Sequence, residues 1–188
     1  MKVYHGSSSR SITKFDLRHS LRTNLDFGKG IYFTTSIEQA IAWSCRNKSA
    51  GAVYECEIDI TGFSVLNLDK KDEDLLYVLY LCRIGLEDYA DTVDGFENAD
   101  IVMGLMLDGK VKKFEDLAER FNAGDVPYEK FYEQVELYSN GYDQICIKSK
   151  DALQQINTSI KKVYYTQKAM GNIQIVQTVN IGDENDEI

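Results

Sequence analysis

Strict alternation of apolar and acidic residues over positions 52–60 is the sequence feature that most limits how this chain can fold. The apolar side consists of Tyr54, Cys56, Ile58 and Ile60, and the acidic side of Glu55, Glu57 and Asp59. A period of two is typical of an antiparallel strand that is buried on one face only. The chain therefore needs at least one antiparallel sheet.

Further strands are predicted on both sides of this segment. They cover residues 2–7, the end of 28–36, 143–149, 161–167 and 173–179. Ser36, followed by Gln39 three positions on, is a capping box and starts a helix with an apolar stripe. Three more helical stripes fall between 70 and 138, with a buried strand or loop at 99–109. We expect an α+β fold with a helical block inserted at about 70–138.

The size and charge of the chain set further limits. It has 188 residues, enough for one domain, which we place at 1–180. Residues 181–188 contain four acids and no base, so they are expected to form a solvated acidic tail. The net charge of −9 argues against a protein that binds nucleic acid mainly through phosphate contacts.

The four cysteines and two histidines bear on metal content and redox setting. None of the cysteines forms a C-x-x-C pair, so we expect no metal site and a reduced, cytoplasmic setting. We find no run of 18 apolar residues and no apolar signal region at the start, which predicts no membrane segment.

Two short segments carry the chemistry that the sequence offers. The first is Tyr4-His5-Gly6-Ser7, where an imidazole stands beside a glycine at a strand end. The second is 27–33, Phe-Gly-Lys-Gly-Ile-Tyr-Phe, where Gly28 and Gly30 allow a backbone to approach a ligand closely. Taken alone, each is equally well read as a turn histidine or a flexible loop before a core strand.

A third element is Trp43, which lies about 120° around the helix from the apolar stripe and so must face something other than the core. In order, these segments resemble the NAD-binding core of the ADP-ribosyltransferases, in the class of diphtheria toxin and the poly(ADP-ribose) polymerases. The resemblance covers about residues 3–60 and returns at 143–153. The whole chain is most similar to a small bacterial family of that superfamily, often found in toxin–antitoxin or phage-defence contexts. It implies a split antiparallel sheet as the core of the fold.

The resemblance implies roles for individual residues. His5 corresponds to the histidine that binds the adenosine ribose of NAD, and Ser7 lies on the same side. Gly6 grips the nicotinamide amide through its backbone. Tyr32 and Trp43 enclose the nicotinamide ring from two sides. A serine that often binds the carboxamide is replaced here by Ala40.

The largest departure from the class is at position 144. The segment Asp143–Leu153 resembles the strand that starts with a catalytic glutamate, but Gln144 occupies the glutamate position. A glutamine keeps a hydrogen bond to the ribose 2′-OH and loses the negative charge that would stabilise an oxocarbenium-like state. Chain elongation is therefore not expected, and replacing Gln144 by Glu is expected to retain or raise NAD cleavage.

Three residues are candidates for contact with the acceptor. Tyr142 corresponds to the loop that meets the acceptor in this class, and Asp100 and Asp108 flank the apolar run 101–107, where either can act as a base. As alternatives, Tyr142 is an exposed turn residue and the two acids simply end a strand. A mono-ADP-ribosyltransferase with NAD as co-substrate is the leading hypothesis.

The acceptor is expected to be a macromolecule, and the acidic balance slightly favours protein over nucleic acid. A toxin role implies a neutralising antitoxin partner. The alternatives are a module that binds NAD or ADP-ribose without turnover, an NAD glycohydrolase, or an interaction protein that uses the helical block as its binding surface.

Overall fold

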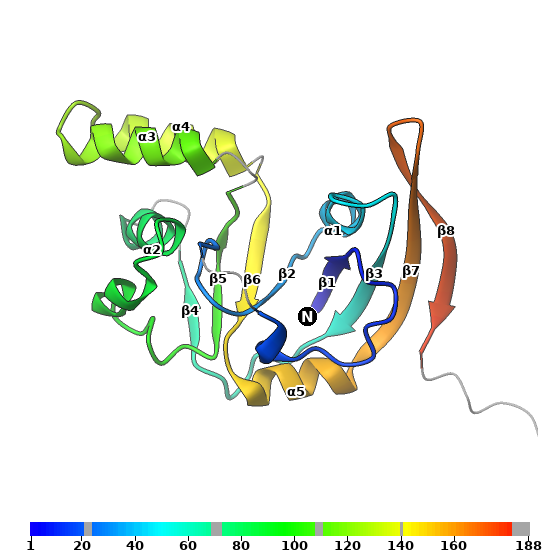
Figure 1. Ribbon diagram of the computed structural model, residues 1–188. Coiled ribbons are helices and arrows are strands. Elements are labelled where there is room, and N and C mark those ends of the chain that lie inside the picture. The colour runs from blue at the N-terminus through cyan, green and yellow to red at the C-terminus, as the bar shows by residue number, and fades with distance from the viewer. Residues whose placement is uncertain (21–23, 69–72, 108–110, 140, 182–188) are drawn as a thin grey trace, which may run out of the picture.

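The computed structural model describes residues 1–20, 24–68, 73–107, 111–139 and 141–181. The fold is α+β, with two four-stranded, mostly antiparallel sheets side by side (Figure 1). The strand order is β1-β3-β7-β8 in the first sheet and β2-β6-β5-β4 in the second. The expected α+β class is confirmed at this level.

The first sheet is antiparallel throughout. It comprises β1 (Lys2–Ser7), β3 (Ala50–Glu57), β7 (Ile160–Ala169) and β8 (Asn172–Asn180). The alternating segment supplies β3, but its acidic side is not simply solvated: Glu55 is only 4% exposed. Its carboxylate lies 3.1 Å from Lys2 Nζ and accepts a hydrogen bond of 2.6 Å from the Tyr164 hydroxyl, because β1 and β7 flank β3.

The second sheet contains β2 (Ile31–Phe33), β6 (Asp143–Ile147), β5 (Ile101–Leu105) and β4 (Val65–Asn67). Strand β5 lies in the middle, antiparallel to β6 and parallel to β4. The stretch from 70 to 138 is therefore not a purely helical insertion, because it supplies a central strand of the sheet. Of the two alternatives expected at 99–109, a buried strand or a loop, the structure has the strand at Ile101–Leu105.

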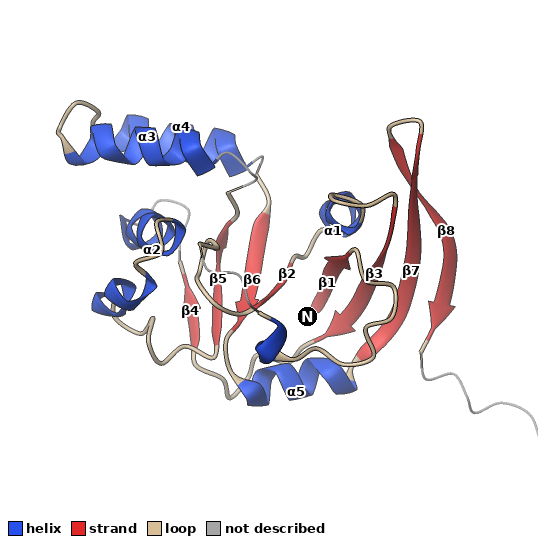
Figure 2. Ribbon diagram, in the orientation of Figure 1, coloured by secondary structure: helices blue, strands red, loops and turns tan. Residues whose placement is uncertain are grey.

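Helices cover the second sheet on its far side and the gap between the sheets at both ends (Figure 2). Helices α2 (Glu73–Arg83), α3 (Val111–Asn122) and α4 (Tyr128–Ser139) lie on the far side with η2 (Glu87–Thr92). Helix α1 (Ile37–Ser44) packs on β1 and β3. Helix α5 (Lys150–Thr158) closes the opposite end, and η1 (Leu17–His19) lies in the loop after β1.

The second sheet is apolar on both faces, so the protein has two cores. Ile101, Ile145 and Ile147 face the core between the sheets, together with α5. Val102, Leu105 and Cys146 face the core under α2, α3 and α4. Gln144 therefore projects on the side of Cys146, opposite to Ile145 and Ile147.

Candidate functional site

In the described part of the chain, an isolated backbone bridge joins the two sheets between Tyr4 of β1 and Thr34, which directly follows β2. The Tyr4 N–H donates to the Thr34 carbonyl at 2.8 Å, and the Thr34 N–H donates back to the Tyr4 carbonyl at 2.9 Å. A narrow pocket lies beside this bridge. It is lined by Tyr4, Gly6, Tyr32, Phe33, Thr34, Gln39, Ala40, Trp43, Met106 and Gln144.

This pocket unites five sequence-predicted site residues from four separate elements. Gly6 comes from β1, Tyr32 from β2, Ala40 and Trp43 from α1, and Gln144 from β6. Its volume is about 10 Å³, so the walls are nearly in contact. A planar ring can enter only if side chains of the lining shift.

The backbone of Gly6 is aimed at this gap. In a strand, the backbone N–H and C=O groups of every second residue point to the same side. The N–H and C=O of Tyr4 are bonded to Thr34, away from β3, so the N–H and C=O of Gly6 also point away from β3. A side chain is excluded here, because a Cβ on Gly6 would lie 2.1 Å from the Ala40 carbonyl oxygen. Close packing of α1 on β1 therefore requires the glycine and brings Trp43 over the strand.

Helix α1 begins as predicted, with Ser36 Oγ accepting from the Gln39 N–H at 3.2 Å. The Gln39 side chain does not complete a capping box. It turns inward, and its Nε2 lies 3.5 Å from Met106 Sδ. Trp43 projects off the apolar stripe into the pocket, and its buried Nε1 has no hydrogen-bond partner among the described residues.

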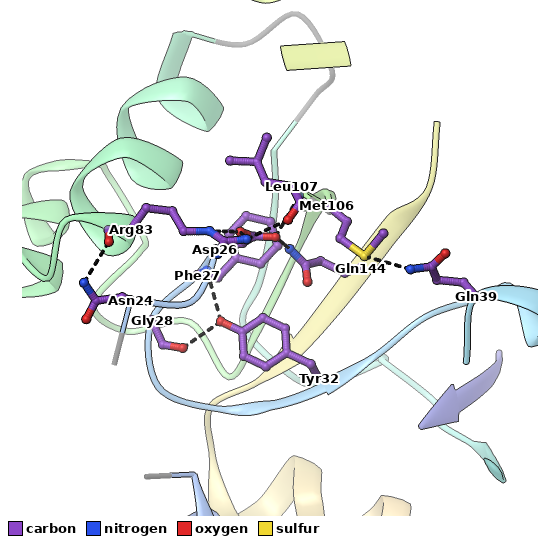
Figure 3. A network of polar contacts seen from close by, with 10 residues as sticks. All are labelled: Asn24, Asp26, Phe27, Gly28, Tyr32, Gln39, Arg83, Met106, Leu107 and Gln144. Carbon is purple, nitrogen blue, oxygen red and sulfur yellow. Dashed lines mark hydrogen bonds and ion pairs between the residues drawn. The ribbon is translucent and has the colours of Figure 1, made fainter. Parts of the chain in front are cut away.

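Tyr32 presents its ring to the pocket while its hydroxyl closes the glycine loop. The hydroxyl donates to the Gly28 carbonyl at 2.6 Å and accepts from the Phe27 N–H at 3.0 Å (Figure 3). Burial raises the pKa of the hydroxyl well above its usual value, so Tyr32 remains neutral. The hydroxyl thus fixes the ring, and the ring face is what a ligand would meet.

Gln144 is only 2% exposed and belongs to a polar network beneath the pocket. Its Nε2 donates to the Asp26 carboxylate, which also accepts from the Leu107 N–H at 2.8 Å and is paired with Arg83 (Figure 3). Arg83 Nη2 donates to the Leu107 carbonyl at 2.7 Å. This network joins β6, the loop before β2, the end of α2 and the segment after β5.

His5 lies on the other face of β1 from Gly6, and its ring contacts aromatic side chains. The ring centroid is 5.0 Å from that of Phe15 and 5.5 Å from that of Phe33. Nδ1 lies 2.7 Å from the Tyr32 carbonyl oxygen, which makes Nδ1 the donor and leaves Nε2 for any further partner. Burial lowers the pKa of His5, which favours the neutral ring.

The glycines of the second segment hold the loop and do not line the pocket. Gly28 has a φ of +71°, and a Cβ there would lie 2.0 Å from the Glu87 carboxyl carbon. A Cβ on Gly30 would lie 2.2 Å from Cys146 Sγ. Gly30 also exchanges hydrogen bonds of 2.9 and 2.8 Å with the Ser20 hydroxyl.

Ser7 likewise lies outside the pocket. It is the last residue of β1, and its Oγ accepts a hydrogen bond from the Ser9 N–H at 3.1 Å. The side chain therefore stabilises the turn after the strand.

The acceptor-side candidates are dispersed. Gln144 pairs with Gly104 near the end of β5, whereas Asp100 directly precedes the start of that strand. Asp100 and Gly104 are therefore about 13 Å apart along the strand. Its carboxylate accepts from the Ser64 N–H at 2.9 Å, so Asp100 does not line the pocket. Tyr142 is nearer, because its carbonyl accepts from the Met106 N–H at 3.1 Å. Asp108 lies outside the described residues.

Sequence reasoning missed Asp26, Arg83 and Met106. Asp26 directly precedes the segment 27–33, but its partner Arg83 is 57 residues away, and no local pattern connects them. Gln39 was identified only as a capping residue. The one available signal was a charged residue, Asp26, between the apolar residues Leu25 and Phe27.

A family model described as a protein of unknown function, DUF3990, matches residues 1–158. This chain belongs to the DUF3990 family. The match includes every residue of the pocket and the polar network, and it ends at the last residue of α5, before β7 and β8. No curated protein and no solved structure matches the chain.

Two further properties of this DUF3990 protein concern membranes and metals. None of its described helices is long and apolar enough to span a bilayer. Within the same residues, no group of three or more His, Cys, Asp or Glu side chains is placed to hold a metal ion.

Proposed function

We propose that this DUF3990 protein is an NAD-dependent mono-ADP-ribosyltransferase built on the split-sheet fold of that superfamily. The observation that supports the proposal is the pocket at the β1–β2 bridge. It gathers Gly6, Tyr32, Ala40, Trp43 and Gln144, which the sequence resemblance assigned to one ligand, from segments up to 138 residues apart.

The lining matches the chemistry of a nicotinamide. Tyr32 and Trp43 supply aromatic faces for ring stacking. The backbone of Gly6 supplies one donor and one acceptor for a carboxamide, and the unpaired Trp43 Nε1 supplies a further donor. These groups are complementary to an aromatic amide, which needs two apolar faces and polar partners at one edge.

In the proposed reaction the bond between the nicotinamide nitrogen and the ribose C1′ breaks, and the bonding electrons leave with neutral nicotinamide. The ribose becomes oxocarbenium-like, and the Gln144 amide oxygen accepts a hydrogen bond from its 2′-OH. A nucleophile of the acceptor then attacks C1′ and releases its proton. His5 would serve the adenosine ribose through Nε2, since Nδ1 is held by Tyr32.

A second candidate is a module that binds NAD or ADP-ribose without turnover. It is favoured by one observation, the neutral amide of Gln144 at the position where the class uses a carboxylate. Nicotinamide release separates it from the transferase, because both functions require NAD binding.

The test measures nicotinamide release from NAD labelled in the nicotinamide, and in parallel the transfer of label from adenine-labelled NAD to macromolecules of a cell lysate. Release with transfer supports a transferase, and protease or nuclease treatment then identifies the acceptor class. Release without transfer indicates a glycohydrolase. Binding without release supports the binding module.

Three variants make the test specific. We expect His5→Ala and Tyr32→Ala to abolish turnover. Tyr32→Phe is the matched control, because it keeps the ring face and removes only the hydroxyl that holds the loop. Full turnover in both alanine variants would exclude the proposed site.

A further inference from the structure

The carboxylate of Asp26 is buried beneath the pocket, where four segments of the fold meet. It is 3% exposed and lies next to the amide of Gln144, the residue at the expected catalytic position. Its partners in the network are all donors: Arg83, the Leu107 N–H and Gln144 Nε2. A carboxylate satisfies all of them, whereas a protonated acid would have to turn its own proton toward one of these donors.

Ionisation of Asp26 is set by a balance of burial and charge. Burial has the larger effect and raises the pKa of Asp26, while the Arg83 guanidinium, the Leu107 N–H and the Gln144 amide oppose that rise. Arg83 is itself held by the Leu107 carbonyl. Because each partner donates, we assign the carboxylate form to the resting protein.

This contact determines which end of the Gln144 amide faces the pocket. A glutamine amide has a donor end and an acceptor end of nearly the same shape, and only its partners select the orientation. An ionised Asp26 can only accept, so it takes the Nε2 end (Figure 3). The Oε1 end is then turned away from Asp26 and is available as an acceptor toward the pocket that Gln144 lines.

We propose that Asp26 is a positioning residue, which fixes the Gln144 amide with its oxygen toward the ribose 2′-OH and polarises that oxygen by holding the amide N–H. This inference rests on the proposed function. A carboxylate is thus present one hydrogen bond beyond position 144, and it is paired with Arg83 on its other side.

The proposal changes what is expected of Gln144→Glu. In the wild-type background that substitution places two carboxylates in contact, and such a pair holds a shared proton because both cannot ionise freely. The single variant should therefore lose activity at neutral pH, with a pH profile that the wild type lacks. The higher NAD cleavage that the sequence predicts for Gln144→Glu should appear only when the residue at position 26 no longer carries a charge.

The decisive experiment exchanges the carboxylate of Asp26 and the amide of Gln144 in two steps. In the first step, Asp26→Asn, the amide of Gln144 loses its fixed orientation, and we expect kcat for nicotinamide release to fall about 10-fold or more, equivalent to about 1.4 kcal/mol. KM for NAD should stay within about 3-fold of the wild-type value.

The double variant combines Asp26→Asn with Gln144→Glu. The new amide at position 26 then donates to the new carboxylate at position 144, and the net charge equals that of the wild type. The carboxylate now stands beside the proposed ribose position and is held by a donor. This double variant should recover at least wild-type kcat.

Asp59→Asn is the matched control for loss of a carboxylate, because Asp59 is exposed and its side chain accepts a hydrogen bond of 3.0 Å from the nearby Thr61 N–H. Thermal unfolding of every variant shows that it is folded. If the wild type turns over NAD, and the folded double variant is no more active than Asp26→Asn, Asp26 has only a structural role and the proposal is wrong. If the wild type itself releases no nicotinamide, the proposed transferase function fails first.

Discussion

His5 Nδ1 lies 2.7 Å from the carbonyl oxygen of Tyr32, and this contact ties the edge strand of one sheet to the edge strand of the other. It stands next to the isolated backbone bridge between Tyr4 of β1 and Thr34, the residue that follows β2. Two residues that the sequence resemblance assigned to NAD are therefore also a link between the sheets. Their substitution is expected to affect both ligand binding and stability.

The first prediction concerns the pH dependence of folding. Burial lowers the pKa of His5, so the folded protein resists a proton that the unfolded chain accepts below about pH 6.5. The contribution of neutral His5 to the free energy of unfolding is fully present above about pH 6.5 and is lost as the pH falls below that value. Thermal unfolding at pH 7.5 and 5.5 should show a smaller decrease of Tm in His5→Gln than in the wild type.

The matched control for that measurement is His19→Gln, which alters the exposed histidine of η1. It should keep the wild-type decrease of Tm. An equal decrease in His5→Gln and the wild type would show that His5 does not contribute to the acid sensitivity of the fold.

The second prediction uses Trp43, the single tryptophan of the chain. Because its ring lines the pocket, NAD or nicotinamide should change the intrinsic fluorescence in a saturable way. Tyr32→Ala removes the second aromatic ring of the lining and should weaken NAD binding by up to about 10-fold, as expected for an aromatic contact worth about 0.5–1.5 kcal/mol. A titration that leaves the emission unchanged at millimolar NAD would exclude ligand binding at Trp43.

The third prediction concerns Gly6. An added Cβ would lie 2.1 Å from the Ala40 carbonyl oxygen, so Gly6→Ala must push α1 away from β1. We expect it to lower the free energy of unfolding by about 1–3 kcal/mol, which is the usual cost of overpacking. Urea denaturation measures this change. Ser7→Ala, on the same strand, should stay within about 0.5 kcal/mol of the wild type. Equal stability of all three proteins would disprove the close packing of α1 on β1.

The fourth prediction concerns thiol reactivity. All four cysteines are buried and free of disulfide bonds. Burial raises the pKa of Cys56, of Cys82 and of Cys146 to about 12 in each case, so little thiolate forms at pH 8. A thiol reagent should modify these three slowly in the folded protein, and all four cysteines at once in denaturant. Rapid modification of Cys146 in the folded state would show that the core beneath the glycine loop opens readily.

Much of the fold can be predicted from local sequence patterns. Alternation predicts the strands at 52–60 and 143–149, strands are also predicted at 2–7, 161–167 and 173–179, and Ser36 predicts the start of α1; all are found, with somewhat different ends. Trp43 was expected to leave the core because of its angle on the helix, and it lies in the pocket. Helix α5 was missed, although Ser149 caps it by accepting from the Ala152 N–H at 3.2 Å.

The sequence by itself therefore determined most of the strands and the start of α1, because alternation, helical spacing and capping repeat or act over a few neighbouring positions. Only the tertiary structure decided the partners. It buried Glu55 between β1 and β7, removed Asp100 from the pocket, and joined Asp26 to Gln144 across 118 positions of the chain. Contacts of this kind depend on the order of strands in the two sheets, which no short-range pattern encodes.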